Sequence, residues 1–182
     1  IENKLGIKGS PTCEMVFTNA PAKLVGDRKL GLIKYVMALM NSARLGIGAQ
    51  SVGLAEAAYR EAVKYANERK QFGVSIGSFG AIKQKLATMA TQAFATESAV
   101  YRVGQDIENR IAQLEAEGKT PQEAKLMGVE EYAIECAMLK VKASEVGQMI
   151  TDEGIQIFGG MGYSADTPMD AAYRDVRITR IY

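Results

Sequence analysis

Residues 81–114, AIKQKLATMATQAFATESAVYRVGQDIENRIAQL, decide the fold of the chain. Apolar or small residues recur here at spacings of three and four, which is the period of one buried helix face. The stripe consists of Ile82, Leu86, Met89, Ala93, Glu97, Val100, Gly104, Ile107, Ile111 and Leu114. Its one interruption, Glu97, is expected to be paired or less deeply buried, and Gly118 is expected to end the helix. The stripe predicts a long helix that packs within a bundle.

The segment before this helix carries a similar pattern. Residues 30–69 contain no proline, and a helix of roughly 40 residues would be ~60 Å long, so it needs neighbours along its length. Its stripe consists of Ile33, Met37, Met40, Arg44, Ile47, Ser51, Leu54 and Ala58.

Two more helices are predicted after Gly118. Thr120 and Glu123 form a capping box around Pro121 and begin the third helix. Its stripe consists of Tyr132, Cys136, Leu139, Ala143, Val146, Ile150 and Ile157. Thr167 caps a fourth helix that is expected to continue to Tyr182. The prediction is an all-α fold, an antiparallel four-helix bundle over residues 29–182.

A short β segment is expected in front of the bundle. Cys13, Met15 and Phe17 alternate with Glu14, Val16 and Thr18, which is the period of a half-buried strand. One strand is not stable alone, so its partners are expected outside the chain. Because the first residue is Ile1, we expect the chain to be part of a longer protein.

Composition excludes several kinds of site. The 182 residues include no histidine, so Ser-His-Asp and Cys-His systems, HExxH zinc sites and Glu-x-x-His di-iron sites are excluded, and no metal site is expected. Lys plus Arg is 22 and Asp plus Glu is 21, which gives no basic field for nucleic acid. No apolar run approaches the ~18 residues of a membrane span. Two cysteines form at most one disulfide, so a reducing compartment such as the bacterial cytoplasm is expected.

Several residues that suggest chemistry are better explained by packing. Gly46 and Gly48, followed by Gly53, lie inside a predicted helix and follow no strand, so close helix packing is favoured over a dinucleotide loop. Cys13 and Cys136 are interpreted as buried small hydrophobes. The methionines expected to fill the core are Met37, Met40, Met89 and Met149.

Two segments favour a ligand. Arg69, Gln71 and Phe72 offer a cation, an amide and an aromatic ring, which suits a nucleotide, although an Arg there could simply complement the helix dipole. The loop at residues 156–163 contains three glycines, which permit close backbone approach, and a helix C-cap explains only one of them.

The chain resembles the acyl-CoA dehydrogenase family at three places in fixed order. GSPTCEMVF resembles the last strand of the middle β domain, so residues 1–28 correspond to the end of that domain and its linker. MNSARLGIGAQSVGLAEAAYREAVKYANERKQFG resembles the first helix of the C-terminal domain. DEGIQIFGGMGYSADTPMDAAYRDVRITRIY resembles the third helix, its glycine loop and the start of the fourth helix, within which the chain is expected to be truncated. The insertion near residues 118–127 resembles the larger bacterial members.

This resemblance implies a reaction of fatty-acid metabolism. A glutamate removes the α-proton of an acyl-CoA while hydride leaves the β-carbon for FAD, and the electrons pass to an electron-transfer flavoprotein. Arg69, Gln71 and Phe72 match FAD contacts, whereas many relatives have a glutamine that touches FAD at the position of Gly80. Four residues match a loop that reaches the FAD of a neighbouring subunit, which implies a homo-oligomer, a dimer or tetramer; they are Gln156, Phe158, Gly159 and Gly160.

The resemblance also implies where substrate and base lie. Asn41 and Arg44 match the acyl-CoA end of the first helix. The catalytic glutamate of most relatives would follow Tyr182, and a minority place it at the position of Ala43. No catalytic residue is therefore expected within the chain, and residues 1–182 alone are expected to lack dehydrogenase activity.

Alternative functions and the acyl chain length stay open. An acyl-CoA oxidase or a flavin monooxygenase of the same fold would differ in how oxygen reaches the reduced flavin. A non-enzymatic helical interaction module would not require Arg69 and Gln156 to converge.

Overall fold

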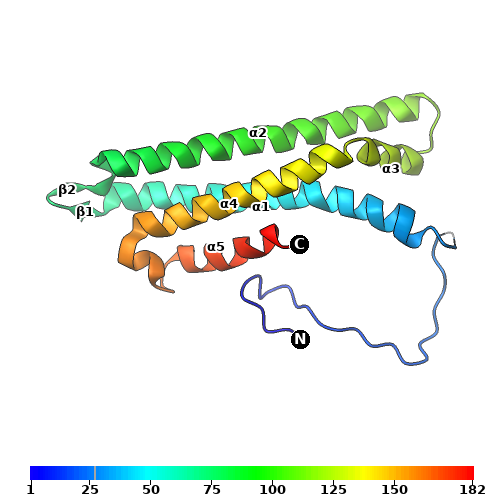
Figure 1. Cartoon of the computed structure of the whole chain (residues 1–182), viewed down its shortest axis with the longest axis horizontal. Coiled ribbons are helices and arrows are strands. Elements are labelled where there is room, and N and C mark those ends of the chain that lie inside the picture. The colour runs from blue at the N-terminus through cyan, green and yellow to red at the C-terminus, as the bar shows by residue number, and fades with distance from the viewer. Residues whose placement is uncertain (27) are drawn as a thin grey trace.

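The computed structural model describes residues 1–26 and 28–182, and of Leu32 and Ile33 only the backbone. Its main helices alternate in direction along the chain (Figure 1). They are α1 (Met37–Glu68), α2 (Gly80–Ala116), α4 (Ala133–Phe158) and α5 (Pro168–Val176), with α3 (Pro121–Glu131) between α2 and α4. The predicted four-helix bundle is confirmed. A π-helical turn, Gly31–Val36, leads into α1, and a 3-10 turn, Ile76–Ser78, leads into α2.

The stripe on α2 is confirmed. Every one of its residues is buried or half-buried, and the deepest are Met89, Val100, Ile107 and Leu114. Glu97 lies at a half-buried point of the stripe. Gly118 follows the helix with a φ of +91°, a backbone angle that favours glycine, as expected for a residue that ends a helix.

The third predicted helix is two helices, so the prediction of one continuous helix was wrong. The chain bends at Tyr132, where φ is −99° and ψ is 22°. Before the bend α3 packs on α2, and a side chain at Gly128 would meet Ile111 at 2.7 Å. After the bend α4 packs mainly on α1. The capping box at Thr120 is confirmed, with Glu123 N–H donating to the Thr120 hydroxyl at 3.3 Å.

Small residues hold α1 against α4. Ala55, Ala58, Ala62 and Ala66 are buried and share a core with large apolar residues of α2 and α4. Gly48 also packs closely, since a Cβ there would meet Val100 at 3.4 Å. Gly46 and Gly53 have open space around them, so close packing explains only one of these three glycines.

The stripe on α1 is only partly buried. Ile47, Ser51 and Ala58 are buried, whereas Met37 and Met40 are exposed, which corrects their assignment to the core; the side chain of Ile33 lies outside the described residues. Of the other methionines expected in the core, Met89 is buried and Met149 packs against the core partly buried.

The fourth predicted helix, α5, is shorter than expected. α5 gives way to a 3-10 turn, Arg177–Arg180, so the expectation of a helix running to Tyr182 was wrong. Thr167 does not cap α5 with its side chain, because its hydroxyl donates to the carbonyls of Met161 and Ser164, each at 3.2 Å.

The segment at residues 13–18 forms no strand and is exposed, contrary to the prediction. A strand needs a partner for its backbone groups, and none of the described segments pairs with it. The strands in the described part of the chain are β1 (Lys70–Gln71) and β2 (Val74–Ser75), an antiparallel hairpin. Cys13 is exposed, which corrects its interpretation as buried, whereas Cys136 is buried as predicted.

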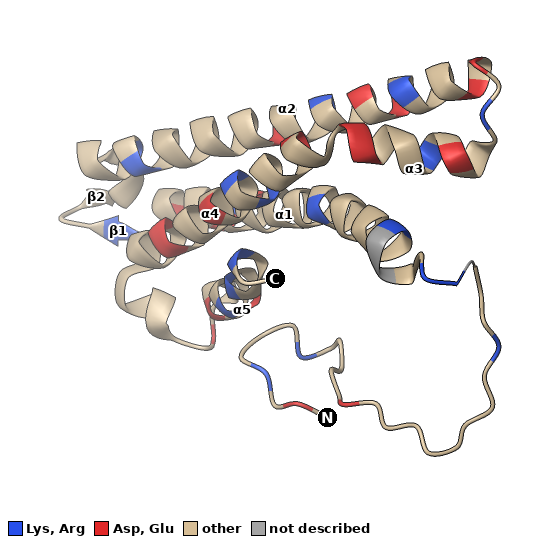
Figure 2. Cartoon of the chain, turned by 45° about the vertical axis from the view of Figure 1, so that its right-hand side comes forward, with Lys and Arg blue, Asp and Glu red and all other residues tan. Residues whose placement is uncertain are grey.

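The start of the chain is fixed to α5. The amide of Ile7 donates to Asp175 Oδ1 at 2.6 Å, and Gly6 lies so close to the Arg174 carbonyl that a Cβ would approach its oxygen to 2.5 Å. Acidic and basic side chains alternate along the long helices rather than gathering by sign (Figure 2). Within the described residues, no helix is long and apolar enough to cross a membrane.

Candidate functional site

The hairpin at the end of α1 presents exposed polar and aromatic groups. Arg69 is the C-cap of α1, and it and Gln71 are both exposed. Phe72 is 93% exposed and has a φ of +53°, an uncommon angle for a side chain of this size. Its ring meets Phe79 edge to face, with centroids 6.3 Å apart. A solvated aromatic ring on a tight turn suits contact with a ligand or another chain better than local stability.

The glycine loop after α4 has an open backbone. Gly159 adopts φ 60° and ψ −136°, a combination that residues with a side chain avoid. A Cβ at Gly159 or Gly160 would meet nothing within 4 Å, so a ligand can approach this backbone closely. Gly162 is different, because a Cβ there would lie 2.4 Å from the Ile155 carbonyl oxygen. The first two glycines leave room for a ligand, and the third is required by packing.

Phe158 belongs to the core. Its ring stacks on Tyr65 with centroids 4.1 Å apart and an interplanar angle of 15°, and only 7% of the residue is exposed. Gln156, two residues earlier, is exposed. The stack ties the end of α1 to the end of α4, so the hairpin and the glycine loop lie at the same end of the bundle (Figure 1).

Of the two predicted substrate-binding residues, Arg44 lines a groove between α1 and α4, whereas Asn41 lines a cavity beside α3. Arg44 Nη1 donates to Asn41 Oδ1 at 2.8 Å, and Asn41 is buried while Arg44 is half-buried. Arg44 opens into a cavity of about 590 Å³, here called the Arg44 groove. Its walls are Met40, Ala43, Arg44 and Ile47 from α1, Ala137, Lys140 and Val141 from α4, and Tyr182.

Tyr182 closes one side of the Arg44 groove. Its hydroxyl donates to Gln50 Oε1 at 2.9 Å, and Lys140 Nζ lies 6.0 Å from the centre of its ring. The same tyrosine lines a second cavity, of about 690 Å³, between the start of the chain and α5. Tyr182 is therefore a wall shared by two cavities.

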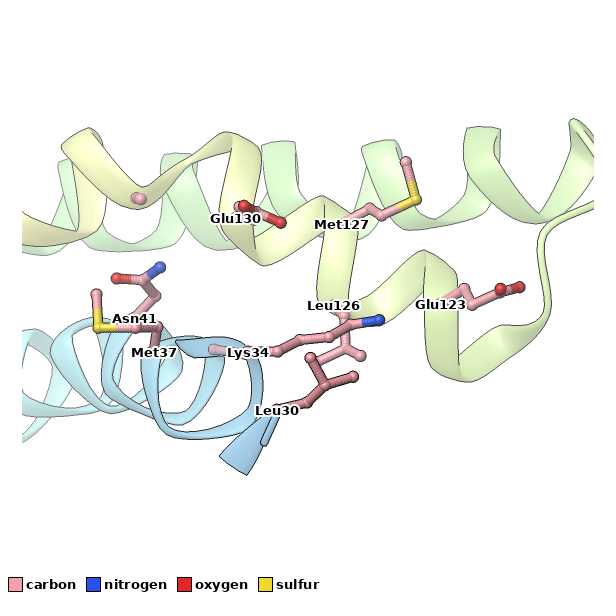
Figure 3. Close-up of a pocket in the computed structure, with 10 residues that line it drawn as sticks. Leu30, Lys34, Met37, Asn41, Glu123, Leu126, Met127 and Glu130 are labelled. Carbon is pink, nitrogen blue, oxygen red and sulfur yellow. The ribbon is translucent and has the colours of Figure 1, made fainter. Parts of the chain in front are cut away.

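Charge distinguishes the Arg44 groove from a cavity beside α3. The charged residues that line the Arg44 groove are Arg44 and Lys140, both cations. The cavity beside α3, of about 650 Å³, contains Lys34 together with Glu123 and Glu130 (Figure 3). Hydrogen bonds from the Thr120 side chain and backbone lower the pKa of Glu123, so this carboxylate stays charged. The Arg44 groove suits an anionic ligand, and the cavity beside α3 does not.

Cys136 lies close to the groove without reactive character. Burial raises the pKa of its thiol, Glu135 raises it further, and Arg44 only partly opposes these effects. A buried thiol with a raised pKa carries little thiolate at neutral pH, so it is a poor nucleophile.

Comparison with known proteins shows to which family this arrangement of helices belongs. The family model described as acyl-CoA dehydrogenase, C-terminal domain, matches residues 33–182. The chain belongs to the acyl-CoA dehydrogenase family. The crystal structure of an acyl-CoA dehydrogenase complexed with FAD from Bacillus anthracis superposes with a TM-score of 0.94 at 38% identity, covering 100% of this chain and 31% of that one.

Two further relatives of this acyl-CoA dehydrogenase domain are similar. Acryloyl-CoA reductase (NADH) of Anaerotignum propionicum is 37% identical over 185 residues, covering 100% of this chain and 42% of that protein. Butyryl-CoA dehydrogenase from Megasphaera elsdenii has a TM-score of 0.80 at 36% identity, covering 100% of this chain and 43% of that one. The chain thus spans 31% to 43% of the length of these three relatives.

Sequence reasoning missed part of the Arg44 groove. Lys140 carried a weak signal, because it is a cation four residues after Cys136 and directly beside Leu139 of the predicted stripe. Gln50 and Tyr182 carried none, since only the folded chain brings the two side chains together.

Proposed function

We propose that the chain is the C-terminal domain of a FAD-dependent acyl-CoA dehydrogenase that oxidises the α,β-bond of an acyl-CoA thioester and passes the electrons to an electron-transfer flavoprotein. One observation carries the proposal: Tyr182, at the other end of the sequence from Ala43 and Arg44, lines the same groove as these two neighbours. Family membership supplies the reaction class, and the groove supplies a place for the thioester.

The catalytic carboxylate fits the same groove. In the family this carboxylate either follows the position of Tyr182 or occupies the position of Ala43. Here Tyr182 and Ala43 both line the Arg44 groove. A carboxylate from either direction would reach one ligand. We propose that a glutamate after Tyr182 takes the α-proton, with Arg44 and its partner Asn41 orienting the thioester.

The walls of the groove suit an acyl chain. Met40, Ile47 and Val141 present apolar surface, and Arg44 is a cation beside it. Loss of the α-proton places negative charge on the thioester carbonyl, and fixed positive groups stabilise such charge most when water is excluded. With an acyl chain bound against them, the apolar walls would reduce the access of water, and the cation would lower the energy of the enolate.

The opposite end of the domain fits FAD. The Arg69 residue is exposed, and its guanidinium, which has no hydrogen-bonding or ion-pair partner among the described residues, suits the pyrophosphate. Gln71 and the exposed ring of Phe72 lie beside it. The open backbone at Gly159 and Gly160, together with exposed Gln156, would reach a neighbouring subunit's FAD, which requires a dimer or tetramer. FAD, when bound, supplies the hydride acceptor, and because the two ends of α1 lie far apart, the flavin held at this end would serve the Arg44 groove of the neighbouring subunit.

The ring of Phe158 is buried, so only its backbone is proposed to contact FAD.

The exposed thiol of Cys13 agrees with the proposed location of the whole protein in the reducing bacterial cytoplasm.

The test uses the full-length flavoprotein without oxygen. Addition of an acyl-CoA should bleach the oxidised flavin band, and an electron-transfer flavoprotein should restore it faster than oxygen does. Faster restoration by oxygen would favour an oxidase or monooxygenase. A protein that binds FAD but shows no bleaching with short, medium, long or branched acyl-CoAs would overturn the proposal.

A further inference from the structure

Lys140 is a half-buried cation in the Arg44 groove without a carboxylate partner among the described residues. Two other lysines of the bundle have polar partners. Lys142, half a turn further along α4, donates to Gln92 Oε1 at 3.2 Å, and Lys85 pairs with Glu153. Lys140 instead extends along the groove wall, where its ammonium lies over the Tyr182 ring.

The second cation of the groove is also without a carboxylate. Arg44 uses one guanidinium nitrogen on Asn41 Oδ1, a neutral acceptor. The Arg44 groove therefore places two cations beside apolar walls with no anion among its lining residues. Neither cation has a carboxylate partner among the described residues, so the glutamate proposed after Tyr182 and a bound ligand would both lie beside positive charge. The arrangement is suited to a ligand that carries or develops negative charge.

A lysine on a helix often only extends its ammonium into solvent. Two contacts argue against this explanation for Lys140. Its ammonium is attracted to the face of the Tyr182 ring, and that ring is held in turn by the hydrogen bond to Gln50. The charge is thus held at the Tyr182 wall of the groove that Arg44 also lines.

We propose that Lys140 is a second substrate-binding cation which, with Arg44, stabilises the negative charge that develops on the thioester when the α-proton leaves. This inference rests on the proposed function, because it assigns a new residue to that site. Tyr182 is a positioning residue that holds Lys140 in place.

The experiment measures ionisation of a bound substrate analogue in the full-length flavoprotein. A 3-thiaacyl-CoA has an acidic α-proton and no easy hydride transfer, so its enolate accumulates and produces a long-wavelength charge-transfer band with the flavin. We expect Lys140→Met to reduce the ionised fraction at fixed pH by roughly tenfold, which is one pKa unit. Lys140→Arg should keep most of the band, and the matched control Lys142→Met should keep all of it.

Equal band intensity in Lys140→Met and the wild-type enzyme would overturn the inference, as would equal losses in Lys140→Met and Lys142→Met. Flavin content and thermal unfolding check that each variant is folded. If Lys140→Met loses flavin, Lys140→Gln repeats the neutral substitution with a polar side chain. A folded wild-type enzyme that neither ionises the analogue nor is reduced by any acyl-CoA would instead overturn the proposed function.

Discussion

The two halves of α1 differ in what they bury. The half at residues 51–68 buries Ala55, Ala58, Ala62 and Ala66 against α2 and α4. The half at residues 37–50 exposes Met37, Leu39 and Met40, and its buried residues lie beside the Arg44 groove. The same helix thus packs into the core in one half and lines the proposed substrate groove in the other.

This difference shows how one helix serves two purposes. Small residues let α1 approach α4 closely, and such packing leaves no space for a ligand. Larger apolar residues on the first half stay exposed, and with Arg44 they form a surface that a ligand or another domain can cover. Substitutions in the two halves should therefore affect different properties.

The largest effect is expected where the second half of α1 meets the glycine loop. Phe158→Ala should lower the free energy of unfolding by about 3–5 kcal/mol, because a buried aromatic ring and its stack on Tyr65 are both lost. Urea denaturation of the domain measures this. Phe158→Leu should recover much of the stability, and a Phe158→Ala variant as stable as wild type would show that the ring is not part of the core.

The same substitution at two alanines compares the halves directly. Ala62→Leu should destabilise the domain by about 1–3 kcal/mol, because the site is fully buried and has no room. Ala43 is exposed, so Ala43→Leu should change the free energy of unfolding by less than about 0.5 kcal/mol. In the full-length enzyme, however, Ala43→Leu should raise the KM for acyl-CoA, because it fills the Arg44 groove. Equal stability losses at both positions would contradict the comparison.

The smallest effect is expected at the cap of α3, outside both halves. Hydrogen bonds to Thr120 lower the pKa of Glu123 in the folded state, so its stabilising effect is present above the unfolded pKa and is lost as pH falls. The Tm difference between wild type and Glu123→Gln should be largest near neutral pH and should shrink as the solution is acidified through the carboxylate range. A difference that grows on acidification would contradict this assignment.

The sequence predicted those parts of the fold that depend on local pattern. The α2 stripe and the capping box at Thr120 were both found in advance. The bend at Tyr132 was missed because the apolar stripe continues through it, and only packing of α3 on α2 and of α4 on α1 requires the chain to turn. The sequence does alternate at residues 13–18, but without a partner strand this segment forms no β-ladder.

For the site too, residues within one motif were predicted, and groupings that depend on packing were not. Arg44 and Asn41 were identified from their place in a motif, and the structure joins them by a hydrogen bond. The glycine loop was also identified, although burial of Phe158 gives that ring a structural role. Lys140, Gln50 and Tyr182 could not be grouped from the sequence, because their contacts depend on how α1, α4 and the end of the chain meet in space.

The central claim is that Ala43 faces the place where the thioester is oxidised. The most direct test starts from a full-length enzyme in which the glutamate expected after Tyr182 is changed to glutamine, which should abolish flavin reduction by acyl-CoA. Adding Ala43→Glu should restore a measurable part of that reduction, because a carboxylate from α1 would enter the same Arg44 groove. A folded, FAD-loaded double variant that shows no reduction by any acyl-CoA oxidised by the wild-type enzyme would contradict the account.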